Sequence, residues 1–354
     1  MLTDPSIIQD IQARASIVNA ISSFLISREF INVQTPILTA LAGGATARPF
    51  ETTATEFTDR KLALRIAPEL WLKRLLVGGM QKVFEIGPSF RNEGLDRTHN
   101  PEFHTCEFYA VGWTVDRLQK ETVKLVGDAV RAIGSRAASE FNACIGDAHK
   151  VDDFSPWHSI DFIPALNHAL GCELPDLSKP DARESILEIF EAKDLVLPST
   201  PTLPRLLDRL CSIYLEPHCQ AATWIVNTPE CLSPLAKSFP HPDLPYQQVA
   251  ARAELFIQHK EVVNCYEEEN SPIEQRRKFV DQQKYAKLGE DFDLEAMKSD
   301  EDYIRALEWG LPPTGGWGCG IDRLCMLMLG KDKISDVLAF GNLRSVTRGA
   351  EKKV

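Results

Sequence analysis

The stretch Phe90–Tyr109 (FRNEGLDRTHNPEFHTCEFY) combines arginine, histidine, glutamate and aromatic residues directly after the apolar segment Val83–Ile86. The guanidinium group of Arg91 can hold a phosphate or carboxylate through two hydrogen bonds. The Glu93 carboxylate can accept a hydrogen bond from an exocyclic amine, and Phe103 can stack on a flat base. A surface ladder of ion pairs is the commoner explanation for a single Arg–Glu pair, but it does not explain the aromatic residues. The stretch therefore predicts binding of a ligand that carries both charge and a flat ring.

A second group of polar residues lies in the segment Glu254–Asn270 (ELFIQHKEVVNCYEEEN), which alternates like strand, turn and strand with the turn at Gln258–Lys260. Because side chains alternate along a strand, three polar residues share one face: Asn264, Tyr266 and Glu268. Glu261 falls on the opposite face unless the strand bends. Clustered carboxylates suit Mg²⁺, whereas the alternative is a solvated acidic hairpin.

Two further segments combine glycine or proline with a charged residue. Gly315–Gly330 (GGWGCGIDRLCMLMLG) places glycines before a helix expected at Asp322–Leu329, and Arg323 lies in its first turn, where it can meet a polyphosphate. Glu69 follows Pro68 at a helix start, where a carboxylate is favourable. The alternatives are a glycine turn with a buried ion-paired arginine and simple helix capping.

The elements that would position these residues are predicted from hydrophobic spacing. A helix is expected over residues 7–30, followed by a short strand over Phe30–Pro36. Other expected elements are strands at Val83–Ile86, Cys106–Val111, Ala222–Val226 and Glu254–Ile257 and helices at Glu69–Leu76 and Ala182–Ala192. Prolines and amphipathic helices between residues 155 and 215 indicate an inserted helical subdomain. This order favours an α+β fold with a mixed, mainly antiparallel sheet flanked by helices.

The composition excludes several classes of protein. The 354 residues contain no run of eighteen apolar residues and no secretion signal, so no membrane span is expected. Nine scattered cysteines without a CxxC pair fit a reducing compartment better than a disulfide scaffold or a zinc ribbon. The net charge of −11 makes any nucleic-acid contact depend on a local basic patch. No P-loop or dinucleotide-binding glycine motif is present.

Taken together, these stretches resemble the class II aminoacyl-tRNA synthetases, and among them the lysyl-tRNA synthetases. Segments similar to the three signature motifs follow the family's order: Phe30–Pro36, Phe90–Glu93 with His99–Phe103, and Gly318–Leu324. Leu64–Gly79 and Gly43–Phe50 are similar to the lysine enzymes rather than those for aspartate or asparagine. The resemblance runs from about Arg14 to Arg344 and implies the class II catalytic fold.

The resemblance also implies the roles of individual residues. The residues expected to bind ATP are Arg91, Glu93, His99, Asn100, Phe103, Glu254 and Arg323. Those expected to bind lysine are Gly44, Glu69, Arg91, Glu107, Tyr109, Asn264, Tyr266 and Glu268. Glu254 and Glu261 would bind Mg²⁺ with ATP, and Arg91 and Arg323 would be catalytic. The residue types agree with these roles, because carboxylates and tyrosines suit a cation on an alkyl stem.

The implied reaction has two steps, namely formation of lysyl-adenylate from L-lysine and ATP and transfer of the lysyl group to the acceptor end of tRNA-Lys. The family further implies a homodimer. "YEEEN" and "DVLAFGNLR" are similar to organellar or fungal members, which makes the mitochondrial matrix or the cytoplasm the expected location.

One departure from the family keeps other functions open. Lysyl-tRNA synthetases carry an N-terminal OB-fold that binds the anticodon, whereas here the helix before the first motif begins near Ile7. We therefore expect a single catalytic domain over residues 1–354 without an OB-fold. The alternatives are a stand-alone paralogue that transfers lysine or a related amino acid to a protein or small molecule, and an inactive dimeric regulatory module. The combination of phosphate-binding arginines and metal-binding carboxylates argues against the inactive module.

Overall fold

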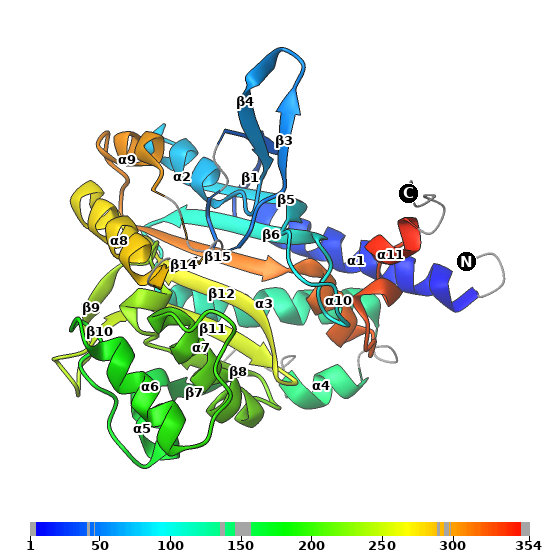
Figure 1. The fold of residues 1–354 in the computed structure, drawn as a ribbon. Helices are drawn as coiled ribbons and strands as arrows, with labels where there is room; N and C mark the ends of the chain where they lie inside the picture. The colour runs from blue at the N-terminus through cyan, green and yellow to red at the C-terminus, as the bar shows by residue number, and fades with distance from the viewer. Residues whose placement is uncertain are drawn as a thin grey trace, which may run out of the picture.

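The computed structural model describes residues 5–40, 43–45, 47–134, 139–145, 157–288, 291–293, 297 and 299–347. Its centre is an eight-stranded sheet (Figure 1). The strands, in spatial order, are β1 (Ile31–Asn32), β5 (Lys82–Phe90), β6 (Glu102–Val111), β15 (Thr314–Gly320), β12 (Lys260–Glu267), β11 (Arg252–Ile257), β8 (Thr223–Val226) and β7 (His158–Asp161). Only the two edge pairs, β1–β5 and β7–β8, are parallel, so the predicted mixed, mainly antiparallel sheet is confirmed.

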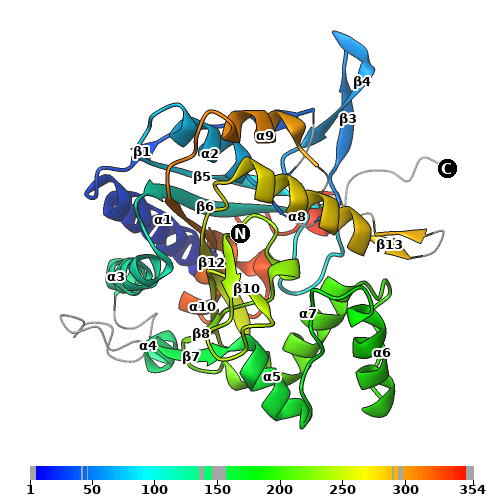
Figure 2. The ribbon, with the colours of Figure 1, turned by 90° about the vertical axis from the view of Figure 1, so that its left-hand side faces the viewer.

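One face of the sheet packs on α1 (Pro5–Ile26), α3 (Val115–Ile133) and α10 (Ile321–Met328), with α4 (Ser139–Ile145) beside them. Figure 2 shows α1 and α3 on the opposite side of the sheet from α7 and α8. The large side chains of this core include Phe108 and Trp317, whose rings stack at 4.8 Å. Because Trp317 and Phe108 fill this side, the residues next to them on their strands face the other side of the sheet.

Two groups of helices flank that other side. The first group is α2 (Glu69–Val77), α8 (Pro272–Tyr285) and α9 (Glu301–Leu307), which share a small hydrophobic core. The second is α5 (Phe162–Leu170), α6 (Ala182–Ala192) and α7 (Leu203–Tyr214), whose leucines and phenylalanines form another core against the sheet. The side chain of Thr202 caps the start of α7. These helices occupy most of the segment expected to be an inserted helical subdomain.

Short elements complete the fold. A three-stranded sheet of β2 (Leu38–Thr39), β4 (Phe57–Leu64) and β3 (Glu51–Ala54) stands away from the body in both views (Figures 1 and 2). Two small hairpins and a short helix are also present: β9 (Ser238–Pro240) with β10 (Gln248–Ala250), β13 (Lys287–Leu288) with β14 (Asp291–Phe292), and α11 (Leu343–Val346). No helix within the described ranges is long and apolar enough to cross a membrane.

The predicted elements agree with the structure in place and type, although several of their ends differ by a few residues. The first helix ends at Ile26 rather than near Phe30, and Glu29 adopts a left-handed conformation with φ 67°. The strand expected over Phe30–Pro36 is reduced to Ile31–Asn32, because this edge strand is paired with β5 only at these two positions. The helix ends in a local turn, in which the Phe30 amide donates to the Leu25 carbonyl at 3.1 Å. The extent of the strand depends instead on where a long-range partner is available, which local spacing does not encode.

Candidate active site

The floor of the site is formed by the glycines of β15 (Thr314–Gly320). β15 presents glycine at three successive positions on the open face of the sheet, and Trp317 and Cys319 point into the core between them. Gly316 lies between Tyr109 of β6 and Tyr266 of β12, and the next glycine lies between their neighbours on the same face. The missing side chains leave a trough, because both flanking strands carry large polar residues there.

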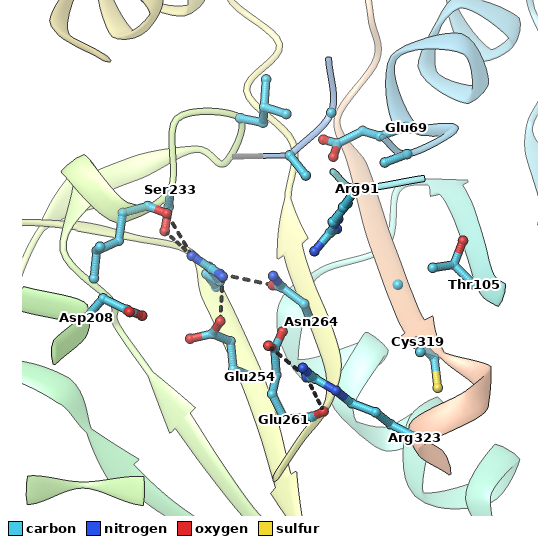
Figure 3. Close-up of a pocket in the computed structure, with 18 of the residues that line it drawn as sticks. Glu69, Arg91, Thr105, Asp208, Ser233, Glu254, Glu261, Asn264, Cys319 and Arg323 are labelled. Atoms are coloured by element: carbon cyan, nitrogen blue, oxygen red, sulfur yellow. Dashed lines mark hydrogen bonds and ion pairs between the residues drawn. The ribbon is translucent and has the colours of Figure 1, made fainter. Parts of the chain in front are cut away.

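A cavity of about 870 Å³ lies over this trough (Figure 3). Its walls include all but one of the predicted site residues, namely Gly44, Glu69, Arg91, Glu93, His99, Asn100, Phe103, Glu107, Tyr109, Glu254, Glu261, Asn264, Tyr266 and Arg323. The exception is Glu268, whose side chain is fully buried behind the wall, with Oε1 against Gly316. The structure thus brings together residues that the sequence spreads over more than half of the chain.

One end of the cavity is cationic. The guanidinium of Arg91 points into the cavity (Figure 3), and its Cζ lies 5.0 Å from the centre of the Phe103 ring. The buried Nε of Arg91 makes no hydrogen bond within the part of the chain that the structure describes. Its backbone is fixed, since Arg91 N donates to the Pro101 carbonyl at 2.9 Å. This Nε is therefore available to donate a hydrogen bond to a bound anion.

Arg323 lies beside this position in the first turn of α10. Its Nη2 is 2.7 Å from Nε2 of His99, and its Nη1 donates to the Glu261 carbonyl at 3.2 Å. Nδ1 of His99 is 2.8 Å from Asp96, so a proton assigned to Nδ1 leaves Nε2 as the acceptor from Arg323. Among the described residues, the hydrogen bonds of the Asn100 side chain go to two backbone groups, the Glu102 carbonyl and the Leu343 amide. Asn100 therefore connects the loop between β5 and β6 to the start of α11.

The carboxylates of Glu254 and Glu261 share a face because β12 contains a bulge. Leu255 pairs with Val263 but Phe256 pairs with Glu261, so Val262 is the extra residue. Because of the bulge, the Glu261 side chain lies on the same face of the sheet as Glu254. The sequence analysis had expected the opposite face unless the strand bends, and the bulge provides that bend. Burial raises the pKa of Glu254 to about 7; the Arg252 charge opposes this rise and the Glu261 charge adds to it.

This carboxylate pair fits Mg²⁺. Within the described ranges, no group of three or more histidine, cysteine, aspartate or glutamate side chains could hold a metal ion alone. Mg²⁺ is usually held by one or two carboxylates together with phosphate oxygens and water. Burial is the main cause of the raised pKa of Glu254, and the Glu261 charge adds to it; such a cation would offset both effects.

The opposite end of the cavity is acidic. Glu69 begins α2, and its Oε1 accepts hydrogen bonds from the Tyr266 hydroxyl at 2.5 Å and from Lys73 at 2.6 Å. Glu107 accepts from the Tyr109 hydroxyl at 3.0 Å. Burial raises the pKa of Glu107 to about 8, and the nearby charge of Glu69 adds to the shift. A cationic ligand would stabilise the charged form of Glu107.

Gly44 lies at the rim of this acidic end. Its φ is +92°, and an added Cβ would lie 3.1 Å from Cβ of Glu69 and 3.2 Å from Cβ of Ala67. Both the left-handed conformation and the close packing favour glycine. The loop backbone can thus approach a ligand held by Glu69.

Several residues that build the site escaped the sequence analysis. Arg252 donates to Glu254 at 2.5 Å and to Asn264 at 2.9 Å, so it links these two predicted site residues. It precedes Glu254 by two positions, and strand alternation could have identified it. Lys73 follows Glu69 by one helical turn, and the same reasoning on helices could have paired them. Asp208 on α7 also lines the cavity, but no local pattern marks it.

A family model described as class II tRNA synthetases (D, K and N) matches residues 1–344. The chain belongs to this family. The resemblance drawn from the three signature motifs is thereby confirmed, as is the class II catalytic fold. The letters D, K and N stand for aspartate, lysine and asparagine, the amino acids on which the enzymes of this family act.

Individual relatives narrow the comparison. The chain is 41% identical to lysine–tRNA ligase cla4 of Cladosporium cladosporioides over 98% of its own length and 57% of the relative's. It is also 41% identical to the mitochondrial lysine–tRNA ligase of Schizosaccharomyces pombe, over 98% of its own length and 64% of the relative's. The chain is 38% identical to the lysine–tRNA ligase of Aquifex aeolicus, over 97% of its own length and 55% of the relative's. The chain thus spans between about half and two thirds of these relatives.

Proposed function

We propose that the protein activates L-lysine with ATP to lysyl-adenylate and transfers the lysyl group to tRNA-Lys. The observation that carries this proposal is the division of one cavity into an acidic end around Glu69 and Glu107 and a cationic end around Arg91 and Arg323. Lysine offers two ammonium groups to the first, and ATP offers phosphates to the second. The names of the relatives, all lysine–tRNA ligases, support the same substrate.

Arg91 would hold the lysine carboxylate against the α-phosphate. The carboxylate then attacks the phosphorus in line, and pyrophosphate leaves. No side-chain nucleophile is needed, because two bound reactants in the correct orientation supply most of the acceleration. Arg91 and Arg323 would stabilise the negative charge that develops on the phosphate oxygens.

Three groups of residues would orient ATP. Glu93 would accept a hydrogen bond from the adenine amine, Phe103 would stack on the ring, and His99 would contact the terminal phosphates. Glu254 and Glu261 would hold Mg²⁺, which when bound supplies further neutralisation of phosphate charge. Arg252 keeps Glu254 in place through its hydrogen bond.

The lysine side chain would lie along Tyr109 and Tyr266, with Glu268 and Asn264 as further contacts and Gly44 near the α-amino group. The partners would be the acceptor end of tRNA-Lys and a second copy of the chain, in a homodimer. Relatives include ligases named mitochondrial and cytoplasmic, and we propose the mitochondrial matrix or the cytoplasm for this protein.

The test is amino-acid-dependent exchange between ATP and pyrophosphate, with Mg²⁺ present, for lysine, aspartate and asparagine in parallel. We expect stimulation by lysine alone. Stimulation by aspartate or asparagine instead, or by none of the three, would overturn the proposal. Charging of tRNA-Lys by the same preparation tests the second step, and exchange without charging would point to a different acceptor of the lysyl group.

A further inference from the structure

A protein ammonium group is buried behind the wall of the acidic end of the cavity. Lys73 is fully buried, its Nζ is 2.6 Å from Oε1 of Glu69, and it forms an ion pair with Oε2 of Glu268. The rings of Tyr266 and Tyr303 are each 5.7 Å from this Nζ. The predicted lysine pocket thus already holds one protein lysine, whose contacts are two of the carboxylates expected to bind the substrate.

The ammonium group fixes both carboxylates. Oε1 of Glu69 is shared between Lys73 and the Tyr266 hydroxyl. Oε2 of Glu268 contacts Lys73 while its Oε1 lies against Gly316. Burial lowers the pKa of Lys73, but the charges of Glu268 and Glu69 outweigh this effect and raise it well above its ordinary value. Lys73 therefore stays charged, and each carboxylate is held through one oxygen.

The charges of the site balance only when Lys73 is counted. The carboxylates of Glu69 and Glu268 face the ammonium group of Lys73, which leaves one negative charge. Free lysine carries two ammonium groups and one carboxylate, hence one positive charge. Without Lys73, two buried carboxylates would face each other unpaired, and one would rotate away or take up a proton.

We propose that Lys73 is a positioning residue for the amino-acid pocket, which orients Glu69 and Glu268 and sets the charge of the pocket to match one lysine substrate. This inference rests on the proposed function. It assigns Lys73 no contact with the substrate, because Lys73 does not line the cavity.

The chain offers a matched control. Lys278 of α8 is also buried and forms an ion pair with Glu269 at 2.7 Å, but neither residue lines the cavity. Lys73→Met and Lys278→Met each remove a buried ammonium group from one of these pairs. Both variants should lose stability in urea unfolding, so a purely structural role predicts the same kinetic behaviour for both.

The measurement is the KM for lysine and for ATP in exchange, together with equilibrium dialysis of labelled lysine. We expect Lys73→Met to raise the KM and Kd for lysine about tenfold or more and to leave the KM for ATP within about twofold, as for groups coupled in one network. Lys278→Met should leave all three within about twofold. Equal changes in the two variants, or equal changes for lysine and ATP in Lys73→Met, would overturn the inference.

Lys73→Gln replaces Lys73→Met in the same measurements if Lys73→Met does not fold. Its amide still donates hydrogen bonds to both carboxylates but carries no charge, so lysine should again be weakened more than ATP, with Lys278→Gln as the control. An unchanged KM for lysine in Lys73→Gln would overturn the inference. Absence of lysine-stimulated exchange in the unsubstituted protein would instead overturn the proposed function itself.

Discussion

Gly316 leaves open the space that the carboxylate of Glu268 fills. A methyl group on Gly316 would overlap Oε1 of Glu268 and would lie 2.6 Å from a ring carbon of Tyr109. Glycine is thus required at this position of β15 by a neighbouring side chain and not by the backbone conformation.

Gly316→Ala should therefore displace Glu268. We expect an overpacking cost of about 1–3 kcal/mol in the free energy of unfolding and a larger rise in the KM for lysine than in that for ATP. Gly318→Ala is the control for stability, because its added methyl group would meet its nearest neighbour, Cγ of Glu107, at an ordinary 3.6 Å. Equal unfolding free energies for the two variants would contradict the assigned packing.

The raised pKa of Glu107 predicts a pH-dependent stability. Burial, together with the charge of Glu69, raises this pKa from 4.5 to about 8 in the folded protein. The folded state then holds the proton more tightly than the unfolded state. This contribution to stability is complete below about pH 4.5 and is lost as the pH rises through about 8.

Glu107→Gln should remove this loss, because its amide does not titrate. We expect the free energy of urea unfolding of the variant, relative to that of the parent protein, to rise by an amount on the order of 3 kcal/mol between pH 5.5 and pH 8.5. Lysine binding should weaken at the same time. If the free energies of unfolding of the two proteins changed equally with pH, the pKa of Glu107 would not be raised in the folded protein.

Arg252 connects Glu254, proposed to bind Mg²⁺, with Asn264, proposed to contact lysine. It donates to Glu254 and Asn264, and its Nη1 donates to Ser233 at 2.9 Å. Arg252→Gln should raise both the Mg²⁺ concentration needed for half-maximal exchange and the KM for lysine, each by roughly tenfold to a hundredfold. Arg252→Gln should thus change both the Mg²⁺ requirement and the KM for lysine, whereas Lys73→Met is expected to act on lysine.

The control for Arg252 is Arg183→Gln, which removes an arginine of α6 that pairs with Glu184 and does not line the cavity. It should change neither quantity. An Arg252 variant with a normal requirement for Mg²⁺ would exclude the link through Glu254.

Arg323 is expected to act on ATP through its planar fork of donors. Arg323→Lys keeps the charge but loses the fork, so the exchange rate should fall roughly tenfold or more, while lysine binding without ATP, measured by equilibrium dialysis, stays unchanged. Lys331→Gln is the control, since Lys331 pairs with Asp10 at 2.7 Å and does not line the cavity. Loss of lysine binding in Arg323→Lys would contradict the assignment to the phosphate end.

The amino-acid sequence alone determined the local elements and the chemistry that they carry. The helix over Ala182–Ala192 was predicted to the residue, and strand alternation placed Asn264 and Tyr266 on one face. Glu69 was placed at a helix start by the preceding proline. These features depend on neighbours a few positions away, and their spacing is visible in the sequence.

Only the tertiary structure decided which elements meet. β6 pairs with β15, which sets Glu107 opposite Gly318, and the Tyr266 hydroxyl bonds to Glu69 from 197 positions away. The bulge at Val262, the glycine floor and the ion pair between Lys73 and Glu268 have the same origin. Each depends on long-range strand pairing and packing, in which the partner of a residue is set by the whole fold and not by the period of its own segment.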